Sequence, residues 1–97
     1  MNKTPFIYIM ASEMNGTLYI GVTSDLVKRV WQHKNGTFEG FSKQYKTNML
    51  VYYEQLDTME QAIIREKQLK EWKRMWKMRI IMEMNPNWDD LYGSICS

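Results

Sequence analysis

Two short apolar runs near the amino terminus, separated by an Asn-Gly dipeptide, constrain the fold of this chain more than any other feature. The runs are Phe6-Ile7-Tyr8-Ile9-Met10 and Leu18-Tyr19-Ile20-Gly21-Val22, and Asn15-Gly16 lies between them. Asn-Gly favours a tight turn because both residues tolerate the positive φ angles of a type I′ turn. The sequence therefore predicts an antiparallel β-hairpin.

Side chains alternate between the two faces of such a hairpin. With Asn15-Gly16 as the turn, the expected cross-strand pairs are Ser12 with Tyr19, Met10 with Gly21, and Tyr8 with Thr23. One face, expected to be the core, carries Ile7, Ile9, Leu18, Ile20 and Val22, and the other is a surface with Tyr8, Met10, Tyr19 and Gly21. A four-residue loop would keep this division, whereas a loop of three or five residues would reverse it. The alternative for the second face is that Tyr and Ile are simply good strand formers and Gly21 ends the strand.

A helix and a third strand are expected after the hairpin. Capping residues at 23–25 precede a helical pattern from Leu26 to about Lys34, and Asn35-Gly36 ends that helix. Residues 37–47 are typical of an irregular connection, and the apolar run 49–54 is typical of a strand.

A long helical pattern fills most of the remaining chain. It begins near Met59, extends to about Met84 with a break near 73–75, and ends at Asn85-Pro86. Residues 87–92 are expected to add one more turn. The predicted fold class is α/β, with a small three-stranded antiparallel sheet in the order hairpin, helix, strand, helices.

The size and composition of the chain bound its class. Its 97 residues suffice for one small domain, expected over residues 1–97. No apolar run approaches the ~20 residues of a membrane helix, and the amino terminus lacks the basic and apolar segments of a signal peptide. The single cysteine, Cys96, excludes an intramolecular disulfide and a cysteine-based zinc site. We expect a cytoplasmic protein without a membrane partner, and its oligomeric state does not follow from the sequence.

Positive charge gathers in one segment, although the formal net charge is only +2. Basic residues of the segment are Arg65, Lys67, Lys70, Lys73, Arg74, Lys77 and Arg79, against the acidic Glu66 and Glu71. A basic helix interleaved with Trp72 and Trp76 is suited to follow a phosphate backbone. The alternative is a solvated helix whose lysines keep the protein soluble.

Arg29 and His33 are four residues apart in the first expected helix and therefore share a face. The apolar Leu26, Val27, Val30 and Trp31 largely occupy another face. Arg29 offers a planar fork suited to a phosphate, and His33 is the one side chain here whose reference pKa is near neutral pH. The alternative is an exposed pair on a solvated helix.

Glu66 lies in the middle of the apolar stripe that Met59, Ala62, Ile63 and Leu69 form on the long helix. A carboxylate in this position needs a charged partner, a protonation shift or a metal ion. The alternative to a metal ligand is a Glu66–Lys70 ion pair on the margin of the stripe.

These spacings together resemble the signature of the GIY-YIG nuclease superfamily. Phe6-Ile7-Tyr8, then ten residues, then Tyr19-Ile20-Gly21 correspond to the two tripeptides, with Phe6 where glycine is usual. Arg29 and Glu66 match the arginine and the metal-binding glutamate of the family, and His33 matches a histidine of several members. The chain looks like a small single-domain bacterial subfamily similar to the nuclease domain of the excinuclease incision subunit.

The resemblance implies a metal-dependent endonuclease that hydrolyses phosphodiester bonds in DNA, or alternatively in RNA, by a single-metal mechanism, with DNA repair as one setting. Glu66 would bind one Mg²⁺ or Mn²⁺, and Arg29 would neutralise charge on the phosphoryl oxygens. Tyr8 and Tyr19 would share positioning of the attacking water and proton transfer, with three nearby cations, Arg29, the metal ion and His33, lowering the phenol pKa. Gly21 would leave room for substrate, and the substrate would also contact Lys70, Lys73, Arg74 and Lys77.

Two departures from the family pattern affect this interpretation. Phe6 should face the same side as Tyr8 and crowd the edge of the cleft. The family often adds an asparagine after its glutamate, for which Asn85 is the candidate. Two rival hypotheses remain: a non-catalytic nucleic-acid-binding or adaptor module with the same fold, and a structural oligomerisation protein built on the basic helix.

Overall fold

The computed structural model describes residues 4–36 and 46–96. Its elements are the strands β1 (Phe6–Ala11), β2 (Leu18–Thr23) and β3 (Met49–Gln55) and the helices α1 (Leu26–Lys34), α3 (Met59–Glu71), α4 (Arg74–Met84) and α5 (Tyr92–Ile95). The strands form one antiparallel sheet in the order β2-β1-β3, which confirms the predicted fold class. Of the connection expected over 37–47, all but the last two residues lie outside the described ranges. Within those ranges no helix is both long and apolar enough to span a bilayer.

The hairpin turn lies one residue earlier than the sequence predicts. Gly16 N donates to Glu13 O at 2.9 Å, so Met14 and Asn15 are the central residues, and Asn15 adopts a φ of 59°. The pairing therefore shifts by two residues and sets Tyr8 opposite Gly21. Because the shift is even, the predicted division of side chains between the two faces is kept. Gly16 is needed here because the Ser12 side chain packs closely against it, and not because its φ is positive. A Cβ at this position would lie 2.4 Å from Ser12 Oγ.

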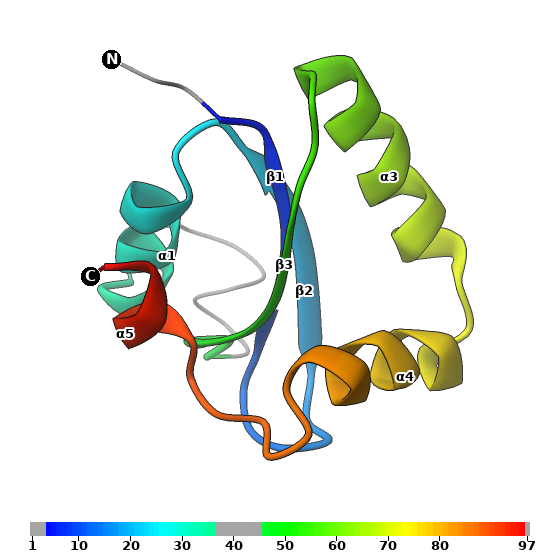
Figure 1. Cartoon of the computed structure of the whole chain (residues 1–97). Coiled ribbons are helices and arrows are strands. Elements are labelled where there is room, and N and C mark those ends of the chain that lie inside the picture. The colour runs from blue at the N-terminus through cyan, green and yellow to red at the C-terminus, as the bar shows by residue number, and fades with distance from the viewer. Residues whose placement is uncertain (1–3, 37–45, 97) are drawn as a thin grey trace.

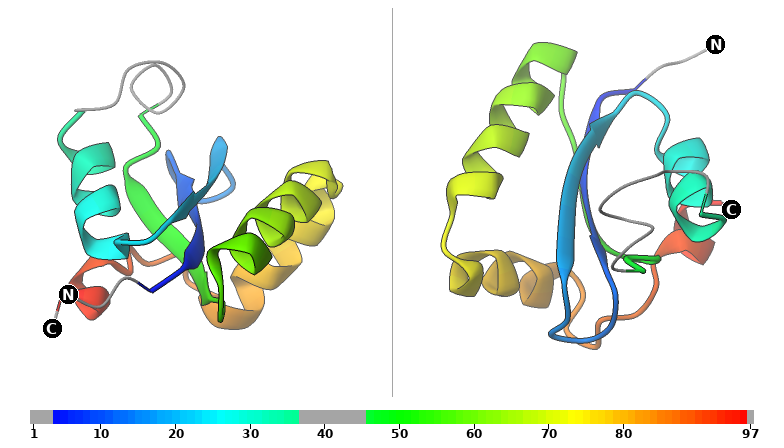
Figure 2. Two further views of the ribbon diagram at one scale, coloured as in Figure 1. Left: turned by 90° about the horizontal axis from the view of Figure 1, so that it is seen from above. Right: turned by 180° about the vertical axis from the view of Figure 1, so that it is seen from behind.

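The sheet is the middle of three layers, with α3 and α4 on one side and α1 and α5 on the other (Figure 1; Figure 2). The face toward α3 and α4 is apolar, as predicted. Its buried residues are Ile7, Ile9, Ala11, Ile20, Val51, Ala62, Leu69, Ile81 and Trp88.

The opposite face, predicted to be a surface, is a second core. Its buried residues are Tyr8, Met10, Leu26, Val30 and Leu50. Tyr8 is only 1% exposed because α1 and the carboxyl-terminal segment cover it. The sequence pattern of a hairpin shows which residues share a face, but the packing of a later helix on that face follows only from the tertiary structure.

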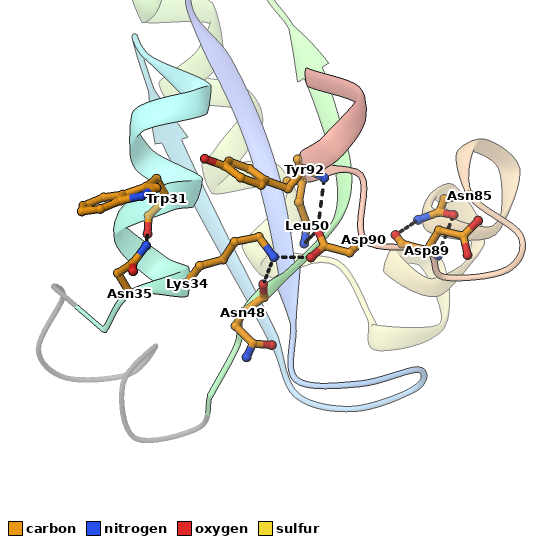
Figure 3. Close-up of polar contacts among 9 residues, drawn as sticks. All are labelled: Trp31, Lys34, Asn35, Asn48, Leu50, Asn85, Asp89, Asp90 and Tyr92. Atoms are coloured by element: carbon orange, nitrogen blue, oxygen red, sulfur yellow. Dashed lines mark hydrogen bonds and ion pairs between the residues drawn. The ribbon is translucent and has the colours of Figure 1, made fainter. Parts of the chain in front are cut away.

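A polar network attaches the carboxyl-terminal segment to the second core (Figure 3). The Lys34 ammonium pairs with Asp90 and donates to the carbonyl of Asn48 at 3.0 Å. The other oxygen of Asp90 accepts hydrogen bonds from the backbone N–H groups of Leu50 and Tyr92. One carboxylate thus links α1, β3 and α5, which places α5 over the Tyr8 face.

The long helical pattern divides into α3 and α4 at Trp72 and Lys73, so the break begins one residue before the predicted range of 73–75 and overlaps it at Lys73. Both residues have extended backbone angles, with ψ near 147° and 146°. Beyond them α4 turns away from the direction of α3 (Figure 1). The last short helix also begins later than expected, at Tyr92.

Candidate active site

Tyr8 and His33 form the centre of the candidate site. The Tyr8 hydroxyl lies 2.9 Å from His33 Nε2, in a hydrogen bond whose donor depends on the tautomer of the imidazole. Burial, followed by the positive charge of Arg29, lowers the pKa of His33 to about 4. His33 is therefore neutral at neutral pH and able to accept a proton on Nε2.

The environment of Tyr8 contradicts one sequence-based expectation. Burial raises the pKa of the Tyr8 phenol well above its ordinary value, with Tyr19 as the next cause. Arg29 acts in the opposite direction, but its effect is smaller than that of burial. With protein groups alone around it, Tyr8 is therefore a neutral phenol. Arg29 acts in the direction that the sequence interpretation expected, but His33 is neutral and does not lower the phenol pKa as a cation.

Gly21 provides space for the Tyr8 ring. A Cβ at Gly21 would lie 2.5 Å from both Cζ and Oη of Tyr8, which is closer than real side chains allow. The space that the sequence interpretation assigned to substrate is therefore occupied by Tyr8 itself. A glycine directly opposite this tyrosine lets the ring approach the β2 backbone closely and reach His33.

Tyr19 and Arg29 complete the cluster on this side of the sheet. The Tyr19 ring lies 4.9 Å from the His33 ring and 6.2 Å from the Tyr8 ring, between ring centroids. Arg29 is close enough for its charge to act on both Tyr8 and His33. The four residues come from β1, β2 and α1, so the structure brings together the predicted tyrosines, arginine and histidine.

The buried face of α1 differs from the one predicted. Leu26, Val30 and His33 are buried, whereas Val27 and Trp31 are 38% and 49% exposed. The predicted apolar face was therefore wrong for two of its four members. His33 is buried beside the second core, so the alternative of an exposed histidine on a solvated helix is wrong. The imidazole can be buried because the Tyr8 hydroxyl is its hydrogen-bond partner.

Glu66 approaches this cluster from α3. Its side chain is 15% exposed and pairs with Lys70 at 3.5 Å, so the ion pair considered from the sequence is present. Its negative charge also contributes to the raised pKa of Tyr8. Ile63, expected on the same apolar stripe, is 38% exposed, which leaves Ala62 and Leu69 as the buried residues of α3.

A groove lies along the edge strand β2, next to the cluster. It has a volume of about 270 Å³ and is lined by Leu18, Tyr19, Ile20, Lys70 and Lys77. Burial, followed by the charge of Arg74, lowers the pKa of Lys77. The groove thus combines a tyrosine of the cluster with two of the four predicted substrate-binding cations.

The other two predicted cations have different surroundings. The Arg74 guanidinium donates to the carbonyl oxygens of Asn15 and Gly16, so it holds the hairpin turn against α4. Lys73 is exposed at the start of α4. The contacts of Arg74 therefore favour a structural role over the predicted substrate contact.

Comparison with known proteins identifies the family. The profile of the GIY-YIG catalytic domain matches residues 4–90. The chain belongs to the GIY-YIG family. It is 36% identical over 78 residues to the UPF0213 protein SSP2268 of Staphylococcus saprophyticus, a match that covers 80% of this chain and 94% of the relative. The UPF0213 protein SAV0488 of Staphylococcus aureus is 35% identical over 78 residues, which again cover 80% of this chain and 94% of the relative.

A solved structure has the same fold. The solution NMR structure of the UPF0213 protein BH0048 from Bacillus halodurans matches with a TM-score of 0.56 and covers 90% of this chain and 92% of that one. At 21% identity this likeness concerns the fold alone. GIY-YIG membership indicates a nuclease in general terms, while the names of the relatives state no activity.

The two departures from the family pattern have structural explanations. Phe6 lies on the Tyr8 face, as predicted, but packs against Tyr53 of β3 at 6.0 Å between ring centroids, away from the β2 groove. Asn85 is buried and donates to the carbonyls of Val51 and Asp89, so it fixes the turn after α4. These contacts show a structural role for Asn85.

The apolar side of the groove was not recognised in the sequence. Leu18 and Ile20 were expected only in the core, yet both also line the groove because β2 is an edge strand. The strand order decides this position, and neither the hairpin pattern nor the third strand indicates whether the third strand pairs with β1 or with β2.

Proposed function

We propose that this protein is a metal-dependent endonuclease that hydrolyses phosphodiester bonds in DNA. The observation that carries the proposal is the convergence of Tyr8, Tyr19, Arg29 and His33 beside the basic β2 groove, with Glu66 near enough for its charge to act on Tyr8. Family membership supports the same reaction class. The groove cations favour a polyanionic substrate.

The donor set fits a hard divalent cation. Within the described residues no three His, Cys, Asp or Glu side chains converge to form a protein-only metal cage. A single partly buried carboxylate is nevertheless suited to Mg²⁺ or Mn²⁺, because Mg²⁺ commonly binds through one or two carboxylates and substrate phosphate oxygens and keeps several waters. Glu66 would hold the ion, which when bound would polarise the scissile phosphate and stabilise the leaving oxygen.

The protein residues would divide the remaining tasks. Arg29 neutralises the charge that develops on the phosphoryl oxygens. Tyr8 accepts a proton from the attacking water on its oxygen while it passes its own proton to Nε2 of His33. This relay needs no free phenolate, so it agrees with the raised pKa of Tyr8 and the neutral state of His33. Tyr19 positions the water at the mouth of the groove.

Replacement of Glu66 tests the proposal. Cleavage of single-stranded, duplex and branched DNA is measured with and without Mn²⁺ for the wild type and for Glu66→Gln, which keeps the size of the side chain and removes its charge. We expect metal-dependent cleavage by the wild type and a loss of at least about 100-fold in the variant. Glu71→Gln, an exposed glutamate on the same helix, is the matched control and should cleave normally.

Either of two results would contradict this function. Wild-type protein that binds DNA but does not cleave it with any divalent ion would favour the non-catalytic binding module. Full metal-dependent cleavage by Glu66→Gln would remove Glu66 as the metal ligand.

A further inference from the structure

A second pocket, separate from the candidate active site, lies where α3 gives way to α4. It has a volume of about 260 Å³ and is lined by Trp72, Trp76, Arg79 and Ile80. This volume is below the ~300 Å³ at which pockets begin to hold drug-sized ligands. Two indole rings in its wall suit a single planar group.

The two indoles of this pocket differ in how firmly they are held. The Trp72 ring is fixed by the Arg65 guanidinium, 5.1 Å from its centroid, and Arg65 is itself paired with Glu54. The Trp76 ring meets Trp72 edge to face at 5.8 Å between centroids and is 53% exposed. The second ring is therefore supported by Trp72 and about half exposed to solvent, which suits a stacking platform.

The charge around the pocket selects its occupant. Helix α4 and its cap carry Lys73, Arg74, Lys77 and Arg79, against the single acidic residue Glu83. A second copy of this chain would bring like charges together, and an apolar peptide would leave Arg79 without a counter-charge. A polyanion with planar rings satisfies both the charge and the indoles.

The pocket and the β2 groove are both lined in part by residues of α4. Trp76 precedes Lys77, and the Lys77 side chain lines the groove that contains Tyr19. Because Trp76 and Lys77 are consecutive on α4, a DNA strand whose phosphate contacts Lys77 would pass the start of this helix, where an unpaired base could stack on the Trp76 ring.

We propose that the Trp72–Trp76 pocket binds an unpaired base of a single-stranded DNA segment that flanks the phosphodiester in the β2 groove. The proposal rests on the nuclease function proposed above and makes it more specific. It assigns the substrate class to DNA with a single-stranded portion next to the cleavage position, because a base within a duplex cannot reach the indole.

Binding measurements without cleavage test this assignment. Affinities are measured by fluorescence anisotropy in EDTA for three labelled DNAs: a blunt duplex, the same duplex with a single-stranded tail, and the same tailed duplex with abasic sites throughout the tail. We expect Trp76→Ala to weaken binding of the tailed duplex about 10-fold, the loss of one stacked base. Binding of the blunt and abasic-tailed DNAs should stay within about twofold of the wild type, because their contacts are to phosphates.

Trp31→Ala is the matched control, since Trp31 is a similarly exposed tryptophan on α1, on the other side of the sheet (Figure 2). It should bind all three DNAs like the wild type. Unchanged affinity of Trp76→Ala for the tailed duplex would overturn the proposal, as would an equal loss on the abasic tail. A wild-type dimer that Trp76→Ala dissociates in sedimentation would instead make this surface a self-interface.

The base-binding pocket and the nuclease function can each fail without the other. If Trp76-dependent binding of the tail is seen but the wild type cleaves nothing with Mn²⁺, the proposed nuclease function fails and the base-binding pocket stands. If the wild type cleaves DNA and Trp76→Ala binds and cleaves tailed DNA normally, the pocket assignment fails and the nuclease function stands.

Discussion

The two faces of the sheet are both buried, but they bury different chemistry. The face under α3 and α4 is packed with apolar side chains and Trp88. The face under α1 and α5 contains Tyr8 hydrogen-bonded to His33, next to Tyr19 and Arg29. The buried residues of one face are apolar, and the other face places a tyrosine and a histidine where water is scarce.

The difference shows how a small domain can hold a reactive cluster rigidly. A buried hydroxyl or imidazole destabilises the fold unless it has a hydrogen-bond partner. Among the described residues, no buried side-chain nitrogen or oxygen lacks such a partner. Both faces bury apolar side chains, and the polar face also uses a hydrogen bond to orient Tyr8.

A core truncation on each face gives the largest expected effects. Ile81 and Leu50 are both fully buried, on the apolar and the polar face respectively. Ile81→Ala and Leu50→Ala should each lower the free energy of unfolding by ~2–5 kcal/mol, measured by urea titration. Below the melting temperature, only Leu50→Ala should also slow cleavage per folded molecule, because Leu50 packs with Tyr8. Equal slowing by Ile81→Ala would show that the faces are not independent.

The titration of His33 should make the stability depend on pH. Unfolded His33 binds a proton near pH 6.5 and folded His33 only near pH 4, so the unfolded state binds more protons between these values. The contribution of neutral His33 to the free energy of unfolding is fully present above about pH 6.5. It is lost as the pH falls toward 4, and the loss is on the order of 3 kcal/mol. Urea titrations between pH 4 and pH 6.5 should show that the free energy of unfolding depends less on pH in His33→Gln than in Ile81→Ala, which keeps His33. An equal dependence in the two variants would show that another group takes up the proton on unfolding.

A methyl group at Gly21 should disturb the polar face alone. Gly21→Ala forces the Tyr8 ring away from β2, with an expected loss of ~1–3 kcal/mol of stability and of most cleavage. Gly93→Ala is the control, because a Cβ at Gly93 meets nothing within 4 Å. Thermal melting and single-turnover rates measure both effects, and normal cleavage by Gly21→Ala would argue that the position of Tyr8 is not critical.

Removal of one hydroxyl should have the smallest effect on stability and still a large effect on rate. Tyr8→Phe should lose about 1 kcal/mol of stability. Its cleavage rate should fall about 100-fold, because the proton relay to His33 is broken. Tyr53→Phe, a partly buried tyrosine of the same face, should cleave normally. A wild-type rate for Tyr8→Phe in single-turnover experiments would exclude the relay.

In the hairpin, the sequence predicted which side chains share a face but not which residues pair across the strands. The division of side chains between the faces was predicted correctly because it depends only on the period of two along a strand. The pairing was wrong by two residues, because the turn also depends on Ser12, whose hydroxyl accepts from Thr17 N at 3.0 Å, and on Arg74, which is 59 residues from Asn15 in the chain.

The sequence by itself determined the types and order of the elements, the family, and the set of residues that carry the proposed chemistry. These follow from local periodicity, capping and spacing. Only the tertiary structure decided that Tyr8 and His33 are buried against each other across 25 residues, that burial outweighs Arg29 at Tyr8, and that β2 is the edge strand beside Lys77. The physical reason is that burial and electrostatic environment depend on contacts between distant segments, and a linear pattern does not specify which segments meet.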